Sequence, residues 1–243
     1  MNVDPAAPAP SSIPSRALQR HQPARLGRLT PGPLYWVILV LLRGVVRLVV
    51  RNHLHVEGRE NVPRTGGVLL ISNHISSADP PLLGAASPRP LHFMAKVEWF
   101  KHRLLGFLAW HFLCFPVVRH TADRGALRHT LDLLARGQAV AIYPEGTRSE
   151  DLRLHHPEAG VGFLARHAGV PIVPVATWGG ENVLQSRGYH LPRAAETHVV
   201  FGLPFTLPAT PMTNQEAAEL MMARIAALLP PRYRGYLDAL EDS

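Results

Sequence analysis

Short apolar runs alternate with longer amphipathic segments over most of the chain, from about Leu54 onward. Several of the runs are continuous and aliphatic or β-branched, which is typical of strands buried on both faces. This pattern predicts strands at Leu54–Glu57, Val68–Ser72, His92–Ala95, Ala139–Tyr143, Pro171–Ala176 and His198–Phe201. It predicts helices at Pro81–Ala86, Trp99–Leu113, Arg124–Arg136, Gly160–His167 and, with Thr213 as N-cap, Glu216–Leu229. Such alternation favours an α/β sheet covered by helices.

The most apolar segment, Leu34–Val50, precedes this region. Its charge-free part, Leu34–Leu42, is only nine residues long, whereas a comfortable bilayer crossing takes about 18–20. Arg43, Arg47 and Arg51 recur every four residues and line one face of a helix. We therefore predict a helix over 33–52 that lies in the membrane interface, with its arginines reaching lipid phosphates. A helix packed on the protein's own core and a tilted spanning helix are the alternatives.

The first 32 residues are rich in Pro, Ala, Ser and Arg and show no apolar periodicity, which predicts a disordered basic tail. No apolar stretch typical of a secretory signal opens the chain. The whole chain of 243 residues has a net charge of +7, which favours an anionic partner. Basic residues beside an apolar segment indicate a membrane surface, and no nucleic-acid-reading motif is present, so we expect no nucleic-acid partner. The single cysteine, Cys114, lies among apolar residues and is expected to be a buried, inert thiol.

A first cluster of polar residues follows the predicted strand Val68–Ser72. It contains Asn73, His74 and Asp79, and catalytic groups in α/β sheets gather beyond the carboxyl ends of strands. Asp79 before Pro80 is typical of a helix N-cap, which leaves His74 on the connecting turn. From there the imidazole can fold back to the carboxylate, which would fix its tautomer while His74 acts as general base. The alternative is a simple cap beside an ordinary loop histidine.

A second polar turn, Tyr143–Ser149, closes the predicted strand that begins at Ala139. Glycine at 146 permits close approach of backbone amides to a ligand, and Arg148 offers a fork that fits phosphate. The turn therefore indicates an anion site. A solvated strand-to-helix turn is the alternative.

These segments resemble motifs of the glycerophospholipid acyltransferases, the lysophosphatidic acid acyltransferase group. Asn73-His-x4-Asp79 resembles the first motif, and Tyr143-Pro-Glu-Gly-Thr-Arg-Ser149 the third, usually written with Phe in place of Tyr143. Three segments together resemble the second motif: Lys96-Val-Glu-Trp-Phe, Gly106 and Phe115-Pro-Val-Val-Arg119. The fourth motif has its counterpart in Val170-Pro-Ile-Val-Pro-Val. Because all four occur in order, the chain is identified as a member of this family.

The resemblance implies an α/β fold with a mixed central sheet covered by helices, in which residues 53–243 form the acyltransferase domain. It makes His74 the base and Asp79 its orienting acid. The residues that would bind the glycerophosphate are Asn73, Lys96, Arg119, Glu145, Gly146, Thr147 and Arg148. Pro171 and Pro174 would shape the strand near the acyl-chain pocket. The second motif departs from the usual pattern at Lys101-His102-Arg103, Leu113 and Val118, and the Lys-Gly pair common after the third is missing, which leaves the acceptor open.

The implied reaction moves an acyl group from acyl-CoA or acyl carrier protein to the free hydroxyl of a lysophospholipid, foremost 1-acyl-sn-glycerol 3-phosphate. A thioester is already activated, so neither a covalent intermediate nor a metal or other cofactor is expected. Membrane lipids and the acyl carrier are the expected partners, at the cytoplasmic face of a membrane. The alternatives are another lysolipid, glycerol 3-phosphate or a glycolipid as acceptor, and a membrane-binding protein without turnover. A lipid hydrolase is disfavoured because no Gly-x-Ser-x-Gly elbow occurs.

Overall fold

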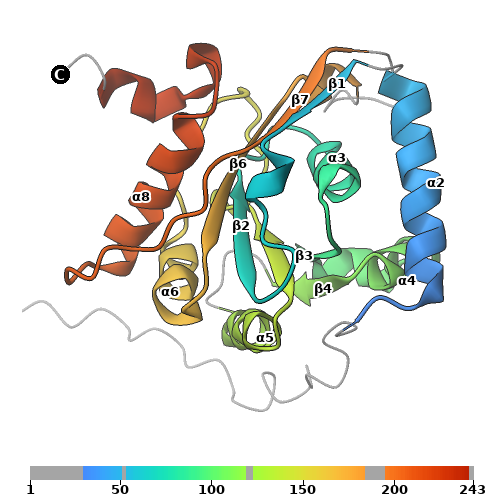
Figure 1. Ribbon diagram of the computed structural model, residues 1–243, viewed down its shortest axis with the longest axis horizontal. Helices are drawn as coiled ribbons and strands as arrows, with labels where there is room; N and C mark the ends of the chain where they lie inside the picture. Colours follow the sequence, from blue (N-terminus) through green and yellow to red (C-terminus); the bar gives the residue numbers. More distant parts are fainter. Residues whose placement is uncertain (1–29, 51–52, 119–122, 184–194, 241–243) are drawn as a thin grey trace, which may run out of the picture.

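The protein's architecture comes from a computed structural model that describes residues 30–50, 53–118, 123–183 and 195–240. Within these residues seven strands form one sheet in the order β1-β7-β6-β2-β5-β3-β4 (Figure 1). The strands are β1 Leu54–Glu57, β2 Val68–Ser72, β3 Leu91–Lys96, β4 Cys114–Val117, β5 Ala139–Ile142, β6 Ile172–Trp178 and β7 Thr197–Phe201. Neighbours are parallel except β6 and β7, which are antiparallel. The predicted mixed α/β sheet is therefore confirmed.

Helices cover both faces of this sheet (Figure 1). The α-helices are α2 Pro33–Val50, α3 Asp79–Ala86, α4 Arg103–His111, α5 Arg124–Ala135, α6 Ala159–Ala168, α7 Gly180–Val183 and α8 Asn214–Ala226. Short 3-10 turns are η1 Arg59–Asn61, η2 Val97–Lys101, η3 Pro231–Tyr233 and η4 Gly235–Leu240. Thr213 caps α8 as predicted, because its side chain accepts a hydrogen bond from the Glu216 amide while Glu216 reaches back to the Thr213 amide.

Six predicted strands agree with the structure to within two residues at each end, but β4 was not predicted. The sequence pattern extended the preceding helix to Leu113, whereas α4 ends at His111 and Leu113 adopts a positive φ of 60°. A proline, Pro116, also lies inside β4. Because β4 is the last strand of the sheet, it tolerates a residue without an N–H group.

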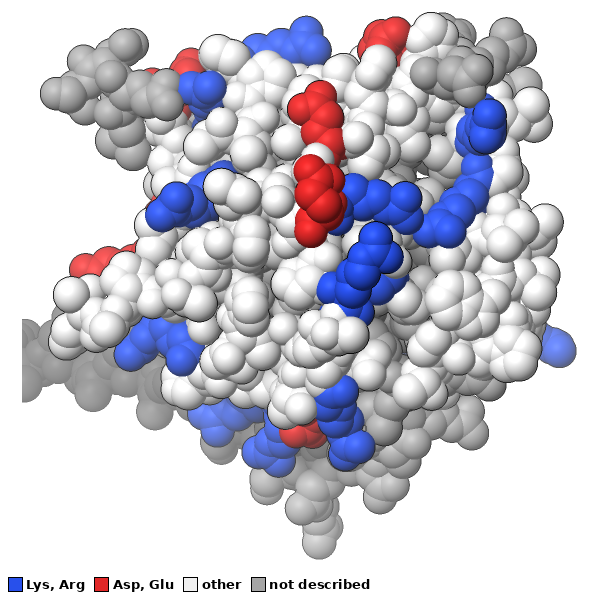
Figure 2. All heavy atoms as spheres, in the orientation of Figure 1, with Lys and Arg blue, Asp and Glu red and all other residues white. Residues whose placement is uncertain are grey.

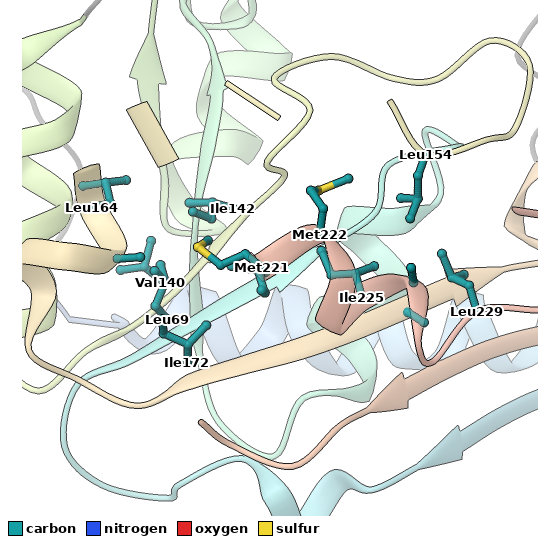
Figure 3. Close-up of a cluster of buried hydrophobic side chains, with 14 of the residues drawn as sticks. Leu69, Val140, Ile142, Leu154, Leu164, Ile172, Met221, Met222, Ile225 and Leu229 are labelled. Atoms are coloured by element: carbon teal, nitrogen blue, oxygen red, sulfur yellow. The ribbon is translucent and has the colours of Figure 1, made fainter. Parts of the chain in front are cut away.

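The core lies on both sides of the sheet. On one face, side chains of β2, β5 and β6 pack against α5, α6 and α8; Figure 3 shows part of this cluster, including Leu69, Val140, Met221 and Ile225. On the other face, residues of the same strands pack against α3, as at Leu70 and Leu83. Burial on both faces explains why these strands read as continuous apolar runs. Cys114 belongs to the second cluster, and burial raises the pKa of its thiol to about 12, as expected for an inert cysteine.

The predicted apolar helix near the N-terminus is present as α2, which runs along α3 and α4 (Figure 1). Tyr35, Leu39 and Val50 face the protein and are buried. Arg43 and Arg47 of the predicted basic stripe are both exposed. Arg43 donates from Nε to the Ala85 carbonyl and from Nη2 to the Ser87 carbonyl, so it fastens α2 to the end of α3. Arg51 and the predicted basic tail lie outside the described residues.

Candidate active site

The centre of the candidate site is a contact between His74 and Asp79, in the segment that joins β2 to α3. Nδ1 of His74 lies 2.9 Å from Oδ2 of Asp79. Asp79 is fully buried and His74 is 7% exposed, so the pair is almost completely shielded from solvent. A carboxylate on Nδ1 favours the tautomer that carries its proton there, which leaves the lone pair of Nε2 available to accept a proton. The predicted contact is therefore present.

Asp79 does not cap α3, contrary to our expectation. The N-cap is Ala78, and Asp79 is the first helical residue, followed by Pro80 and Pro81 in the first turn. Its Oδ2 instead accepts the backbone amides of Ile75 and Ser76, each at 2.8 Å, in addition to His74 Nδ1. The carboxylate therefore organises the turn before the helix, because three donors from that turn converge on one oxygen.

The second polar turn lies against this pair. The Ser149 amide donates to the His74 carbonyl at 2.8 Å, and Nη1 of Arg148 donates to Oγ of Ser77 at 2.7 Å. Arg148 itself is exposed, and its guanidinium has further N–H donors besides the one that Ser77 accepts. The strands β2 and β5 are parallel neighbours, and both turns follow their carboxyl ends, which explains why they meet at one edge of the sheet.

Glu145 links three segments of the site. It is buried, and its two carboxylate oxygens accept the His74 amide at 3.0 Å and the His155 amide at 3.1 Å. Burial raises its pKa to about 7, even though both amides favour the charged form. Because both carboxylate oxygens accept hydrogen bonds from backbone amides, Glu145 is a positioning residue that holds the turn that carries His74.

Asn73 is placed in a similar way. Its side chain is fully buried, donates to the Thr177 carbonyl and accepts from the Thr177 amide, both at 2.8 Å. These two contacts tie the end of β2 to the end of β6. Asn73 and Glu145 were both expected to bind substrate directly, whereas their polar atoms bind the backbone.

A cavity of about 510 Å³ adjoins the site, on the face of the sheet covered by α5 and α6. Most of its lining is apolar: Met94, Val117, Ala126, Leu127, Ile142, Val161 and Leu164. Tyr143 and Gly146 also line it. The ring of Tyr143 stacks on His74 with 4.2 Å between centroids, and Tyr143 also lines the cavity, so this residue contacts both. The volume is within the range of sites that hold a small molecule.

The remaining predicted site residues are distributed as follows. Thr147 and Lys96 are exposed, and Lys96 lies at the carboxyl end of β3. Gly146 has a φ of +69°, a backbone conformation that favours glycine. Pro171 is exposed just before β6, while Pro174 is buried within it, and neither lines the 510 Å³ cavity. Both prolines therefore contribute to the strand more than to a pocket. Arg119 lies outside the described residues.

Three residues of the site were missed by the sequence pattern: Tyr143, Ser77 and Thr177. Tyr143 was noted only as a replacement for the usual phenylalanine, although its ring covers the base. Ser77 is the partner of Arg148, and Thr177 is the anchor of Asn73. A polar threonine inside the apolar run of β6 was the one available signal, and it does not by itself identify a partner.

The pKa of Glu145 leads to a pH-dependence prediction. Above pH 7 the carboxylate accepts both amides, whereas below pH 7 a protonated oxygen faces one of them and that contact is lost. Glu145→Gln imitates the protonated state at every pH. We therefore expect its kcat to be about tenfold below wild type above pH 8 and to approach wild type below about pH 6. Steady-state kinetics from pH 5.5 to about 9 measure this ratio, with the exposed neighbour variant Glu150→Gln as control. A ratio that does not change with pH would remove Glu145 from this role.

Comparisons with known proteins agree with the geometry. The family model described as Acyltransferase matches residues 53–178. The 1-acyl-sn-glycerol-3-phosphate acyltransferase of Bacillus subtilis (strain 168) is 30% identical over 161 residues, which cover 65% of this chain and 77% of that protein. The lyso-ornithine lipid O-acyltransferase of Pseudomonas aeruginosa is 37% identical over 112 residues, which cover 45% of this chain and 42% of that protein.

A solved structure shares the fold. The crystal structure of the 1-acyl-sn-glycerophosphate (LPA) acyltransferase, PlsC, from Thermotoga maritima matches with a TM-score of 0.65 over 80% of this chain and 79% of that chain, at 22% identity. The family match covers more than half of the chain and contains His74, Asp79 and Arg148. This chain belongs to the acyltransferase family and is an acyltransferase enzyme.

Proposed function

We propose that the protein transfers a fatty acyl group from an acyl thioester to the free hydroxyl of a lysophospholipid, foremost 1-acyl-sn-glycerol 3-phosphate, to give phosphatidic acid. The observation that carries the proposal is the His74–Asp79 pair with Arg148 beside it, because acid–base and phosphate-binding groups share one edge of the sheet. The relatives named as 1-acyl-sn-glycerol-3-phosphate acyltransferases support this acceptor.

The chemistry follows from the tautomer of His74. Nε2 takes the proton of the acceptor hydroxyl as its oxygen attacks the thioester carbonyl, and Asp79 stabilises the imidazolium that forms. The carbon–sulfur bond then breaks, the new ester forms, and the imidazolium returns its proton to the departing thiolate. The leaving group is the thiol of coenzyme A or of acyl carrier protein, which takes up the proton that the acceptor hydroxyl lost. These steps require no metal or redox cofactor.

The acceptor headgroup fits the turn at 146–148. The guanidinium of Arg148 is exposed, is held by Ser77 Oγ, and presents further donors in a planar fork that matches phosphate. Lys96 stands exposed at the end of β3, two strands away from β2 in the sheet, and adds positive charge at the same edge. We assign the phosphate to this turn and the acyl chain to the mostly apolar 510 Å³ cavity, which Tyr143 also lines.

Arg148→Ala tests the headgroup assignment. Losing a charge-assisted contact of about 1.5–3 kcal/mol raises KM for a phosphate-bearing acceptor by roughly 10–100-fold, with a smaller change in kcat. Initial rates against acceptor concentration measure the effect, with Arg136→Ala at the end of α5 as a charge-matched control. An acceptor KM equal to that of wild type contradicts the assignment.

We further propose that α2 and α4 hold the enzyme on the cytoplasmic face of a membrane. The window that covers α2 has a mean hydropathy of 2.0, is only 22% buried, and is long and apolar enough to cross a membrane. Its outward stripe consists of exposed apolar residues: Leu34, Val37, Leu41, Val45 and Leu48. Beside it, α4 and η2 expose Trp99, Leu104, Leu105, Phe107 and Leu108.

Figure 2 shows a broad uncharged area over α2 and α4. One continuous apolar face favours a helix that lies along the lipid surface, since α2 packs on the protein along its other side.

Replacing Val37, Leu41 and Leu48 together by glutamine tests the membrane face. At roughly 1 kcal/mol for each side chain withdrawn from lipid, partitioning onto liposomes falls by about 100-fold. Flotation with vesicles that contain anionic lipid measures it. The control is Leu203→Gln, because Leu203 is 76% exposed in the loop after β7, away from this face. Equal flotation of the triple variant and wild type contradicts the assignment.

A second acceptor is favoured by the 37% identity to the lyso-ornithine lipid O-acyltransferase. Ornithine is an amino acid, so an acceptor of that type offers Arg148 no phosphate. Purified protein with radiolabelled acyl-CoA and a panel of lysophosphatidic acid, lyso-ornithine lipid, other lysophospholipids and glycerol 3-phosphate separates the two. We expect phosphatidic acid to be the main product. A preference for the ornithine acceptor that Arg148→Ala leaves unchanged would instead establish the second function.

A further inference from the structure

We propose that the edge formed by β1 and β7 carries a binding site for a divalent transition-metal ion of the zinc type, held by His55, Glu196 and His198. The site is separate from the acyl-transfer residues and does not depend on the proposed function. Two imidazoles and a carboxylate are ligands that Zn²⁺ prefers, and three protein ligands leave a position for water.

Strand pairing brings these side chains together. His55 and His198 are register partners on the parallel strands β1 and β7, and their rings stack with centroids 4.7 Å apart. Glu196 stands immediately before β7, and its Oε2 lies 2.6 Å from His55 Nε2. One ligand atom from each of the three residues lies within 4.8 Å of the others. Zinc bonds of about 2.0–2.1 Å set tetrahedral ligands roughly 3.3 Å apart. Binding therefore has to draw the ligand atoms together and turn the two stacked rings until their ring-nitrogen lone pairs converge.

A fourth residue, His53, orients the carboxylate. Its Nδ1 lies 2.7 Å from the other oxygen of Glu196, Oε1. Metal-bound carboxylates are commonly held by such an outer hydrogen bond, which fixes the oxygen that faces the ion. His55 and Glu196 are about half exposed, at 48% and 61%, so an ion has access from solvent.

The competing interpretation is that no ion binds here and that the histidines share one carboxylate through hydrogen bonds alone.

The cluster is connected to a natural reporter. The indole of Trp178 in β6 stacks on His198 with centroids 4.6 Å apart and an interplanar angle of 10°. The adjacent residue, Thr177, holds Asn73 next to the candidate base. A paramagnetic ion on His198 therefore lies close enough to quench Trp178 fluorescence, and a bound ion would brace the end of β6.

The test is a fluorescence titration of the full, tag-free chain with Cu²⁺, which binds such ligands more tightly than Zn²⁺. We expect saturable quenching with one ion per chain, reversed by a large molar excess of Zn²⁺ because Cu²⁺ is the tighter ligand partner. Trp178→Phe removes the quenched signal while calorimetry still detects binding. Glu196→Gln keeps the size of the side chain and His198→Ala removes a ligand; each loses saturable binding, while His53→Ala weakens it by about 10–100-fold.

The chain has 14 histidines, so a control at another His–carboxylate pair is needed. His156→Ala serves, because His156 contacts Glu219 at 3.2 Å outside this cluster, and we expect it to titrate like wild type. At Zn²⁺ concentrations about 100 times the Kd, the unfolding midpoint of wild type should rise by about 5 °C or more, and that of Glu196→Gln should not. Equal quenching in wild type and Glu196→Gln, or no competition even by a large molar excess of Zn²⁺, would overturn the proposal.

Discussion

His74→Ala lowers kcat for acyl transfer by about 10²–10⁴-fold, which is the contribution expected of a positioned general base. The variant loses the imidazole whose Nδ1 is fixed by Asp79 and whose Nε2 is left to take the hydroxyl proton. The acceptor KM should change little, because Arg148 and the 510 Å³ cavity are untouched. Initial rates with saturating acyl-CoA and lysophosphatidic acid measure the loss.

A stability control accompanies this variant. Alanine also removes the stacking of the imidazole on Tyr143, so part of any loss could come from a loosened turn. His74→Gln keeps a polar side chain without a base of suitable pKa and should be as inactive as alanine. Unfolding midpoints near that of wild type for both variants, with activity retained in either, would refute the assignment of the base.

Asp79→Asn lowers kcat by about 10–100-fold, the second largest effect on kcat that we expect. All three donors to Asp79, from His74, Ile75 and Ser76, converge on Oδ2, while Oδ1 is buried and has no hydrogen-bond partner within the described parts of the chain. The amide oxygen of asparagine can therefore take the place of Oδ2 and keep the turn. What is lost is the negative charge that stabilises the imidazolium. A hydrogen bond to a charged group contributes about 1.5–3 kcal/mol.

Asp79→Ala provides the comparison. It removes the charge and also leaves the Ile75 and Ser76 amides without their acceptor in a buried turn, so it should be both less active and less stable than asparagine. If Asp79→Asn and wild type had the same kcat, the carboxylate would serve the turn alone. If asparagine and alanine were equally unstable, the amide would not replace Oδ2 as described.

Much of the fold could be predicted because the sheet is buried on both faces. Continuous apolar runs such as Val68–Ser72 match the observed strand at both ends. β4 could not be found in the same way, because a proline interrupts it and its apolar residues continue the pattern of α4. The direction of β7 also follows from packing, since no local feature of Thr197–Phe201 distinguishes an antiparallel from a parallel neighbour.

The candidate site was predictable where chemistry is local in sequence. His74 and Asp79 are five residues apart, and their contact follows from one short turn. The functions of Asn73 and Glu145 were not predictable, because their partners, Thr177 and the His155 amide, depend on how distant segments pack. The same reason hid the cluster of His55, Glu196 and His198, since a separation of more than 140 residues is closed only by strand pairing.

The central claim is transfer by His74 from a thioester to a phosphate-bearing lysolipid. Its most direct test incubates the purified full chain with acyl-CoA and lysophosphatidic acid and follows free thiol and phosphatidic acid in the same sample. Equal amounts of the two from wild type, and at least about 100-fold less of both from His74→Ala, are the predicted result. Thiol release without the diacyl product, or phosphatidic acid made by the alanine variant at the wild-type rate, would contradict it.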